Sequence, residues 1–253
     1  MAEVESEIAA RRKTEKELQE LSARVLRLQD EEHRRIAREL HDSTGQTLAA
    51  IKMSVASLQG LVIGVPGAGQ LVEDLNALTD EAIKDIRTTA HLLHPPLLDE
   101  VGFTSAARWY VDELAKRSGI NANLEMSAIP SLTKAAELAL FRVLQESLTN
   151  VLRHSGSKSV DVHLHSDGQN ILLAVRDYGK GIPSEKLTSF RQTGAGVGIG
   201  LGGMKQRLRE LRGHLKVESD ETGTCITASL PASEIQGSNG HRDRHVVQGI
   251  PAA

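Results

Sequence analysis

The sequence predicts a chain in two parts, an all-α N-terminal region followed by an α+β domain. Three observations predict it. A helical pattern without proline runs from residue 5 to 60, and a second one runs from 71 to 93 after a glycine-rich break at 60–69. From about residue 100, helical periods and alternating strand patterns follow one another, as in an antiparallel or mixed sheet covered on one face by helices.

The first long helix carries an apolar stripe. Leu18, Leu21, Val25 and Leu28 are spaced by three, four and three positions, with charged residues between them. This spacing is typical of a coiled coil. A similar stripe continues further along the helix, at Leu40, Thr44, Leu48, Ile51, Val55 and Leu58.

The second helix also has one apolar face, made of Leu71, Leu75, Leu78, Ala82, Ile86, Ala90 and Leu93. His94-Pro95-Pro96 ends it, because proline disfavours helix in the residue before it. Two antiparallel helices with such stripes expose an apolar surface that a second copy of the chain would cover as a four-helix bundle. The sequence therefore predicts a homodimer.

In the second half of the sequence, segments with helical periodicity alternate with segments that have the two-residue periodicity of strands. Helices are predicted at 104–118, 133–153 and 201–211, and strands at 121–129, 160–164, 171–175, 214–218 and 224–230. Turns at 166–169 and 222–223 predict two hairpins. The segment from Ser233 has no periodicity, so we expect a disordered tail at 233–253.

The composition excludes several functional and structural classes of protein. A net charge of -3, with one Trp, two Tyr and three Phe, offers neither the charge nor the stacking surface for direct nucleic-acid binding. The single Cys225 excludes an intramolecular disulfide. No apolar run approaches the roughly 20 residues of a membrane span, and the N-terminus lacks a signal peptide, so we expect a cytoplasmic protein.

The segment HRRIARELHDSTGQ, residues 33–46, places His41 beside Asp42 within a helical pattern. The carboxylate could keep one ring nitrogen protonated and leave the other as a nucleophile. Gly45, one turn later, leaves space above the ring. A phosphorylated histidine explains this arrangement, and a surface helix with an incidental His-Asp pair is the alternative.

Three further segments could carry chemistry. Glu146, Asn150 and His154 are spaced by four on one helical face, with Arg153 beside them. Their oxygens suit Mg²⁺ and their cationic groups suit phosphate, although a polar helix face would look the same.

The second segment is Asp177-Tyr178-Gly179-Lys180-Gly181, which follows a strand. The carboxylate could accept a hydrogen bond from an amino group while the glycines allow close approach of the backbone; the alternative is a solvated turn.

The third segment is GAGVGIGLGGM, 194–204, which leads into a helix near Leu201 and could bind an anion. Its match to G-x-G-x-x-G is accidental, because 183–192 indicates a polar loop or short helix rather than a strand. A P-loop is absent from the sequence.

Together and in this order, the three segments resemble the N, G1 and G2 boxes of the gyrase, chaperone and histidine-kinase ATP-binding superfamily. ARELHDSTGQ, 37–46, resembles the phosphoacceptor segment of the histidine kinase subfamily that pairs with NarL-type response regulators. The subfamily's H-D-x-x-x-Q pattern is present as His41, Asp42 and Gln46. The resemblance covers about residues 30–231.

The resemblance implies four regions, namely a coiled-coil signalling helix at 1–30, a dimerisation and histidine phosphotransfer domain at 31–98, an ATP-binding α/β sandwich at 99–232 and the tail. It also implies ATP and Mg²⁺ as cofactors, a homodimer, and a response regulator with a receiver domain and helix-turn-helix output. Only about 30 residues precede the catalytic core, so we expect input from an upstream sensor domain or a partner.

The resemblance assigns roles to residues. Asn150 would hold Mg²⁺ and Glu146 would support the metal, with Arg153 and His154 near the phosphates. Asp177 would accept the adenine amino group. The base pocket would be shaped by Gly179, Gly181 and Thr224, and the phosphates would be flanked by Gly196, Gly198, Gly200 and Leu201.

In the implied reaction, His41 attacks the γ-phosphoryl group of ATP with Asp42 as general base. Gln46 would orient a water that dephosphorylates the regulator. Two alternatives remain. One is a catalytically weak or phosphatase-biased scaffold that binds ATP, and the other is a gyrase-type ATPase that would not need the His41-Asp42 helix.

Overall fold

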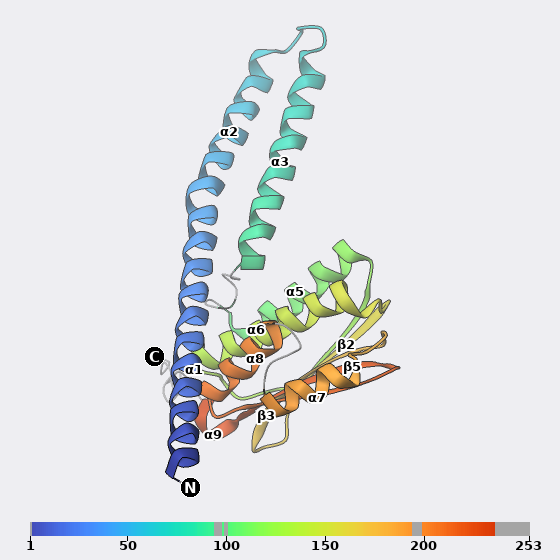
Figure 1. The fold of residues 1–253 in the computed structure, drawn as a ribbon. Helices are drawn as coiled ribbons and strands as arrows, with labels where there is room; N and C mark the ends of the chain where they lie inside the picture. Colours follow the sequence, from blue (N-terminus) through green and yellow to red (C-terminus); the bar gives the residue numbers. More distant parts are fainter. Residues whose placement is uncertain (1, 94–97, 99–100, 194–198, 236–253) are drawn as a thin grey trace, which may run out of the picture.

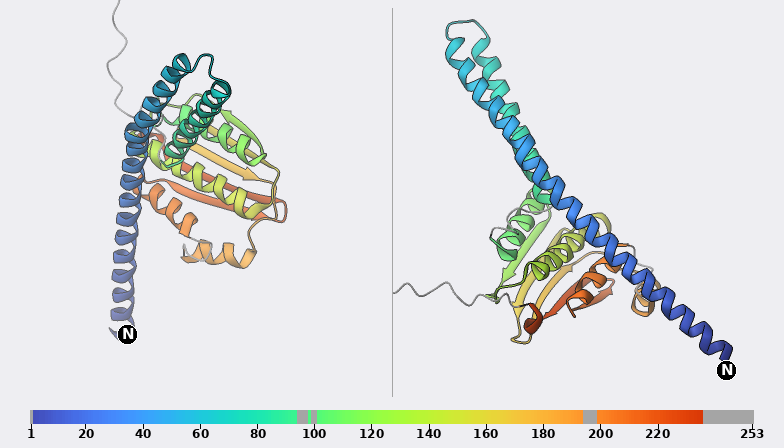
Figure 2. Two further views of the ribbon diagram at one scale, coloured as in Figure 1. Left: turned by 90° about the horizontal axis from the view of Figure 1, so that it is seen from above. Right: turned by 90° about the vertical axis from the view of Figure 1, so that its left-hand side faces the viewer.

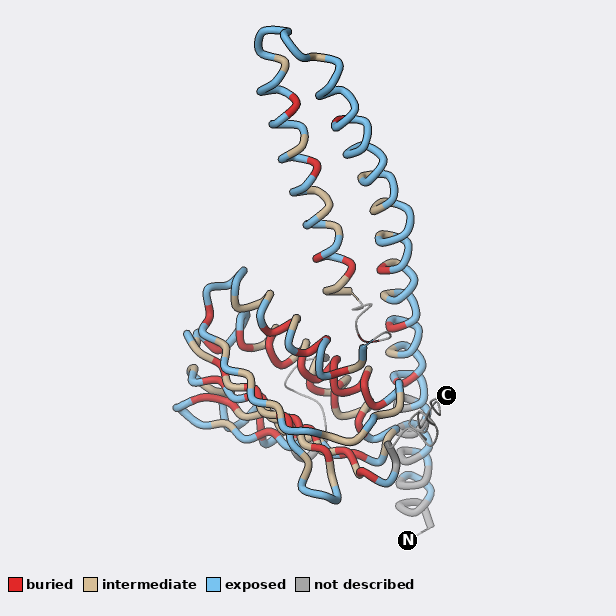
Figure 3. The backbone as a smooth tube through the Cα atoms, turned by 180° about the vertical axis from the view of Figure 1, so that it is seen from behind, coloured by how far each residue is buried: buried red, intermediate tan, exposed pale blue. Residues whose placement is uncertain are grey.

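The computed structural model describes residues 2–93, 98, 101–193 and 199–235. It consists of a long helical stalk and an α/β domain that lies beside one end of it (Figure 1). Buried residues concentrate between the helices and the sheet of the α/β domain, whereas most of the stalk is exposed (Figure 3).

The stalk is built from α1 (Ala2–Glu39), a π-helical turn η1 (Leu40–Thr44), α2 (Gly45–Leu61) and α3 (Ala68–Leu93). The first three elements follow one another without a break, and α3 returns beside α2. The predicted helices and the break near 60–69 are confirmed.

The π turn is a feature that the periodic pattern did not predict. The backbone N–H of Gly45 donates to the carbonyl of Leu40, five residues back. Such a turn inserts one residue into the helix, and π turns occur often at functional sites. His41 and Asp42 lie within it.

The α/β domain contains a five-stranded sheet in the order β1-β2-β3-β5-β4. Its strands are β1 (Asn121–Met126), β2 (Ser159–Ser166), β3 (Asn170–Asp177), β4 (His214–Asp220) and β5 (Gly223–Pro231). Strand β1 pairs parallel with β2, and the other pairs are antiparallel, so the predicted hairpins and mixed sheet are confirmed.

Helices α5 (Phe103–Ser118), α6 (Lys134–Asn150) and α8 (Ile199–Glu210) cover one face of the sheet (Figure 2). Strands β2, β3 and β5 alternate because every second side chain faces this helical layer. The core therefore lies in one layer, and it includes Phe103, Phe141, Leu144, Leu164, Leu173, Leu208 and Leu230.

The N-terminus of α5 is fixed by a side chain from α6. The buried carboxylate of Glu137 accepts a hydrogen bond from the backbone N–H of Phe103 at 3.2 Å. Lys134 balances this carboxylate at 3.0 Å. A carboxylate at a helix N-terminus satisfies unpaired donors and is favoured by the helix dipole.

Two short helices complete the domain. The segment 183–192 forms α7 (Ser184–Thr193), the helical one of the two predicted alternatives, and buries Leu187 and Phe190. Helix α9 (Ala232–Ile235) corrects the expectation of a disordered segment from Ser233, because Ala232 is buried and its N–H donates to the Gln169 carbonyl at 2.7 Å. Residues 236–253 of that predicted tail lie outside the described residues.

The C-terminal half of α1 packs against the α/β domain, beside α8 (Figure 2). A Cβ added to Gly203 of α8 would lie 3.5 Å from Leu26 of α1. Nearby, Arg27 pairs with Glu210 at 3.7 Å. No helix in the described part of the chain is both long and apolar enough to cross a membrane.

Candidate functional site

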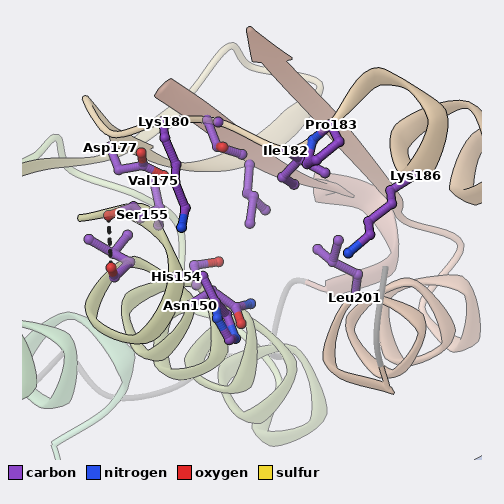
Figure 4. A pocket seen from close by; sticks show the side chains of 15 residues that line it. Asn150, His154, Ser155, Val175, Asp177, Lys180, Ile182, Pro183, Lys186 and Leu201 are labelled. Atoms are coloured by element: carbon purple, nitrogen blue, oxygen red, sulfur yellow. Dashed lines mark hydrogen bonds between the residues drawn. The ribbon is translucent and has the colours of Figure 1, made fainter. Parts of the chain in front are cut away.

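A cavity of about 490 Å³ opens in the α/β domain between the end of α6, the end of β3 and the start of α8 (Figure 4). This volume lies within the range of sites for small molecules and cofactors. The lining side chains come from six segments and are Ser147, Asn150, Val151, His154, Ser155, Val175, Asp177, Lys180, Gly181, Ile182, Pro183, Lys186, Leu201, Thr224 and Ile226.

Asp177 supplies the buried carboxylate of the cavity. It is 6% exposed and ends strand β3. Its Oδ1 accepts a hydrogen bond from the Gly179 N–H at 2.9 Å. Burial raises the pKa of this carboxyl, and the N–H groups of Gly179 and Thr224 oppose that rise. Such a group can accept a hydrogen bond from a ligand amino group while apolar walls hold a flat ring.

The loop after Asp177 is held in place on both sides. The Lys180 N–H donates to the carbonyl of Ser155 at 3.0 Å, and the Ile182 N–H donates to Oγ of Ser219 at 2.8 Å. Gly179 is required by the first contact, because a Cβ there would lie 2.3 Å from the Ser155 carbonyl oxygen. Gly181 adopts φ +69°, and its Cβ would lie 1.9 Å from the carbonyl oxygen of Asp220.

A second π-helical turn, η2 (Val151–Ser155), continues α6 at the cavity wall. It allows both Asn150 and His154 to line the cavity. Oγ of the buried Ser155 donates to the Val151 carbonyl at 2.7 Å and closes the turn. Arg153 is exposed and does not line the cavity.

Glu146 lies one turn before Asn150 and does not line the cavity either. Its carboxylate rests against the first turn of α8, where a Cβ added to Gly200 would lie 1.7 Å from Oε1 of Glu146. A helix N-terminus is a favourable position for a carboxylate. Gly200 therefore makes room for Glu146, a reason for this glycine that the sequence did not reveal.

The structure thus brings together six of the predicted binding residues around one cavity, namely Asn150, His154, Asp177, Gly181, Leu201 and Thr224. Gly179 does not line the cavity itself. It contacts two residues that do, namely Asp177 and Ser155. The predicted Gly196 and Gly198 lie outside the described residues.

Sequence reasoning missed the two lysines of the cavity, Lys180 and Lys186. Lys180 lies within the D-Y-G-K-G segment but was given no role, and Lys186 belongs to the segment predicted as a polar loop or short helix. The apolar walls, which include Val175, Ile182 and Ile226, were also missed as ligand contacts.

The predicted phosphoacceptor residues lie elsewhere. His41, Asp42 and Gln46 are exposed on the stalk and do not line the cavity. The chain therefore presents an accessible histidine and a separate ligand cavity.

The described residues contain no cluster of three or more His, Cys, Asp or Glu side chains suited to a metal ion. Of the two predicted metal-binding residues, Asn150 alone lines the cavity and could offer its amide oxygen. Because Mg²⁺ often uses few protein ligands together with phosphates and waters, this donor set fits a metal that arrives with a nucleotide.

Comparisons with known proteins agree with this two-part arrangement. Residues 32–98 match the family model described as "Histidine kinase". Residues 135–234 match the model described as "Histidine kinase-, DNA gyrase B-, and HSP90-like ATPase". The second match contains the cavity, and the first contains His41.

Three curated relatives are similar over most of this chain. The sensor histidine kinase MctS of Rhizobium johnstonii is 35% identical over 88% of the chain and 48% of its own length. The signal transduction histidine-protein kinase/phosphatase UhpB of Salmonella typhimurium is 32% identical over 83% of the chain and 41% of its own length. The oxygen sensor histidine kinase NreB of Staphylococcus carnosus is 27% identical over 83% and 59%.

The chain spans about half the length of the curated relatives it matches. In this chain the two matched regions follow one another, the histidine kinase region at 32–98 and the ATPase region at 135–234. The chain belongs to the sensor histidine kinases.

Proposed function

We propose that this chain is the catalytic part of an ATP-dependent protein histidine kinase. It transfers the γ-phosphoryl group of ATP to His41 and then passes that group to an aspartate of a response regulator. The observation that carries the proposal is the combination of a buried Asp177 in a nucleotide-sized cavity with an exposed His41 on the stalk.

The cavity supports a nucleotide bound in one orientation. Asp177 accepts the adenine amino group, while the loop of Gly179 and Gly181 and the side chain of Thr224 shape the base pocket. Asn150 and His154 face the phosphates, where Mg²⁺ held through Asn150 would neutralise developing charge. Glu146 acts from its place at Gly200, one helical turn from Asn150.

The separation of His41 from the cavity has a consequence for the reaction. For the transfer, His41 must come close to the cavity of a second copy, or to the cavity of the same chain after the α/β domain has moved. The exposed π turn leaves the imidazole accessible in both cases, and Asp42 acts as the general base.

A homodimer is supported by the exposed apolar residues of the stalk. Side chains that a monomer would leave in water occupy α2 and α3, namely Ile51, Leu58, Leu71, Leu75 and Leu78. On α1, Leu21, Val25 and Leu28 are more than half exposed at coiled-coil spacing. A second copy would cover both sets in a four-helix bundle.

The proposal includes dephosphorylation of the regulator. Gln46 is exposed, one turn beyond Asp42, and could orient a water toward a phosphoaspartate bound at the same surface. The relative UhpB is named as a kinase/phosphatase. We propose a NarL-type regulator with a receiver domain as partner and an upstream sensor as input.

Labelling with γ-³²P ATP and Mg²⁺ tests the kinase activity. We expect acid-labile, base-stable label on the wild-type chain, none on His41→Gln and little on Asp177→Asn. His41→Gln should still bind ATP, which separates loss of the acceptor from loss of the donor site.

The alternatives predict other outcomes. Steady ATP hydrolysis without any phosphoenzyme would favour a gyrase-type ATPase. ATP binding without phosphorylation, even with a regulator present, would favour a scaffold. Full label on His41→Gln would contradict the assigned acceptor.

A further inference from the structure

We propose that Lys180 and Lys186 form the subsite that binds the phosphates of the nucleotide and makes the cavity selective for polyphosphates. Neither residue was assigned a role by the motifs. The inference rests on the proposed function in one respect, namely that the cavity binds an adenine nucleotide.

The two lysines come from the same short segment, between the end of β3 and the first turn of α7, and both line the cavity. In Figure 4 they enter the cavity from opposite sides, Lys180 with its ammonium group toward His154 and Asn150, and Lys186 with its ammonium group toward Leu201. The loop that carries Lys180 is fixed by the hydrogen bond from its N–H to Ser155. Lys186 lies in α7 beside Leu187, whose buried side chain anchors this helix.

The charges of the cavity are unevenly distributed. Asp177 is the one acidic side chain among the lining residues, against the two lysines. Neither ammonium group has a carboxylate partner among the residues that the structure describes. An anionic ligand would supply the missing partner for both.

The two ends of the cavity also differ in charge. Asp177 marks the end that accepts an amino group. At the other end, the ammonium group of Lys186 points toward Leu201 in the first turn of α8 (Figure 4). The first turn of α8 already holds the Glu146 carboxylate, so Lys186 supplies the positive charge at this end of the cavity. The base would therefore lie at Asp177 and the phosphates between the lysines.

The position of Arg153 strengthens this assignment. The family resemblance places that arginine near the phosphates, yet its side chain is exposed and does not line the cavity. Among the lining residues, the two lysines provide the ammonium groups and His154 provides the one imidazole.

The test measures the dissociation constants of ATP, ADP and adenosine with Mg²⁺ by calorimetry or competition. The variants are Lys180→Gln and Lys186→Gln, which keep a long polar side chain and remove the charge. The matched control is Lys158→Gln, an exposed lysine outside the cavity, and Arg153→Gln tests the alternative that this arginine binds the phosphates. Asp177→Asn serves as the variant for the base end.

We expect each lysine variant to weaken ATP binding about fivefold, the upper range for an exposed charge pair, and the effect to grow at low salt. ADP should lose less than ATP, and adenosine should bind as to the wild type. Lys158→Gln should bind all three ligands normally, and Arg153→Gln should lose less ATP affinity than either lysine variant. Asp177→Asn should lose adenosine as well.

Wild-type ATP affinity in both lysine variants would overturn the inference. An equal loss of affinity for adenosine and ATP would overturn it too, as would a loss of ATP affinity confined to Arg153→Gln. If the wild-type chain bound none of the three ligands, the proposed function would fail together with the subsite. If it bound all three and the lysine variants did too, the subsite alone would fail.

Discussion

The Asp30 carboxylate of α1 accepts a hydrogen bond from the Arg142 guanidinium of α6 at 2.8 Å, across 112 positions of sequence. Arg207 of α8 binds the other oxygen of the same carboxylate. Arg142 also donates to the carbonyl of Leu93 at the end of α3, at 3.2 Å. One buried acid on the stalk is thus joined to α6 and α8, the two helices that flank the cavity.

Removal of this acid should loosen the contact between stalk and α/β domain. Asp30 and Arg142 are less than 10% exposed, and Asp30→Ala leaves two guanidinium groups without their carboxylate. We expect the free energy of unfolding to fall by about 3 kcal/mol, because breaking a buried ion pair leaves an uncompensated charge. Urea unfolding and hydrogen exchange of residues 22–34 measure the effect.

Glu32→Ala is the control for that experiment. Glu32 pairs with Arg35 on the exposed side of the same helix, so its loss should change stability little. Equal unfolding midpoints for Asp30→Ala and the wild type would contradict a structural role of the buried pair.

Gly200→Ala should reduce phosphorylation without unfolding the protein. The added Cβ meets the end of the flexible Glu146 side chain, which can move away at low cost. Glu146 would then leave the N-terminus of α8, and the label on His41 should fall at least tenfold while the thermal midpoint stays near that of the wild type. Gly203→Ala is the matched control in the same helix, because its Cβ makes only an ordinary contact with Leu26.

Asp177→Asn should weaken nucleotide binding without lowering the stability of the fold. Burial raises the pKa of Asp177, so the folded protein binds this proton more tightly than the unfolded chain. The stabilisation from the bound proton is complete below the unfolded pKa and is lost as pH rises through the folded pKa. At pH 7 the variant should therefore be at least as stable as the wild type, yet bind ATP poorly.

Measurements of the unfolding midpoint between pH 4 and 8 check the sign of this effect. The stability of the wild type relative to Asp177→Asn should decrease as pH rises through the raised pKa. An increase over the same window would mean that the ionised carboxylate stabilises the fold.

The stalk surface should determine the oligomeric state. Leu78 of α3 is 62% exposed and belongs to the apolar set that a second copy would cover. Leu78→Glu should shift the sedimentation of the chain toward a monomer, because it places a charge in that interface. Met53→Glu changes a more exposed residue of α2 that lies off the stripe, and it should leave a dimer intact.

The local part of the fold could be predicted from the sequence. The hairpin of β2 and β3 follows from alternation on both sides of a turn, and the helix that begins after Thr133 follows from its apolar period. The cavity residues Asn150, His154 and Asp177 could be predicted because each sits in a motif with fixed spacing.

The remaining features depend on contacts that no local pattern encodes. The π turns at Leu40–Thr44 and Val151–Ser155 change the hydrogen-bond register without a distinct residue signal. The contact between Glu146 and Gly200 and the pairing of Asp30 with Arg207 join distant segments. Lys186 reaches the cavity only because α7 folds against it.

The central claim is that His41 receives the phosphoryl group from ATP bound at Asp177. The most direct measurement is mass spectrometry of peptides under alkaline conditions after incubation with ATP and Mg²⁺, with the occupancy of all ten histidines compared. We expect phosphohistidine at His41 in the wild type and its absence in Asp177→Asn. Phosphorylation at another histidine, or equal occupancy of His41 in Asp177→Asn, would contradict the account.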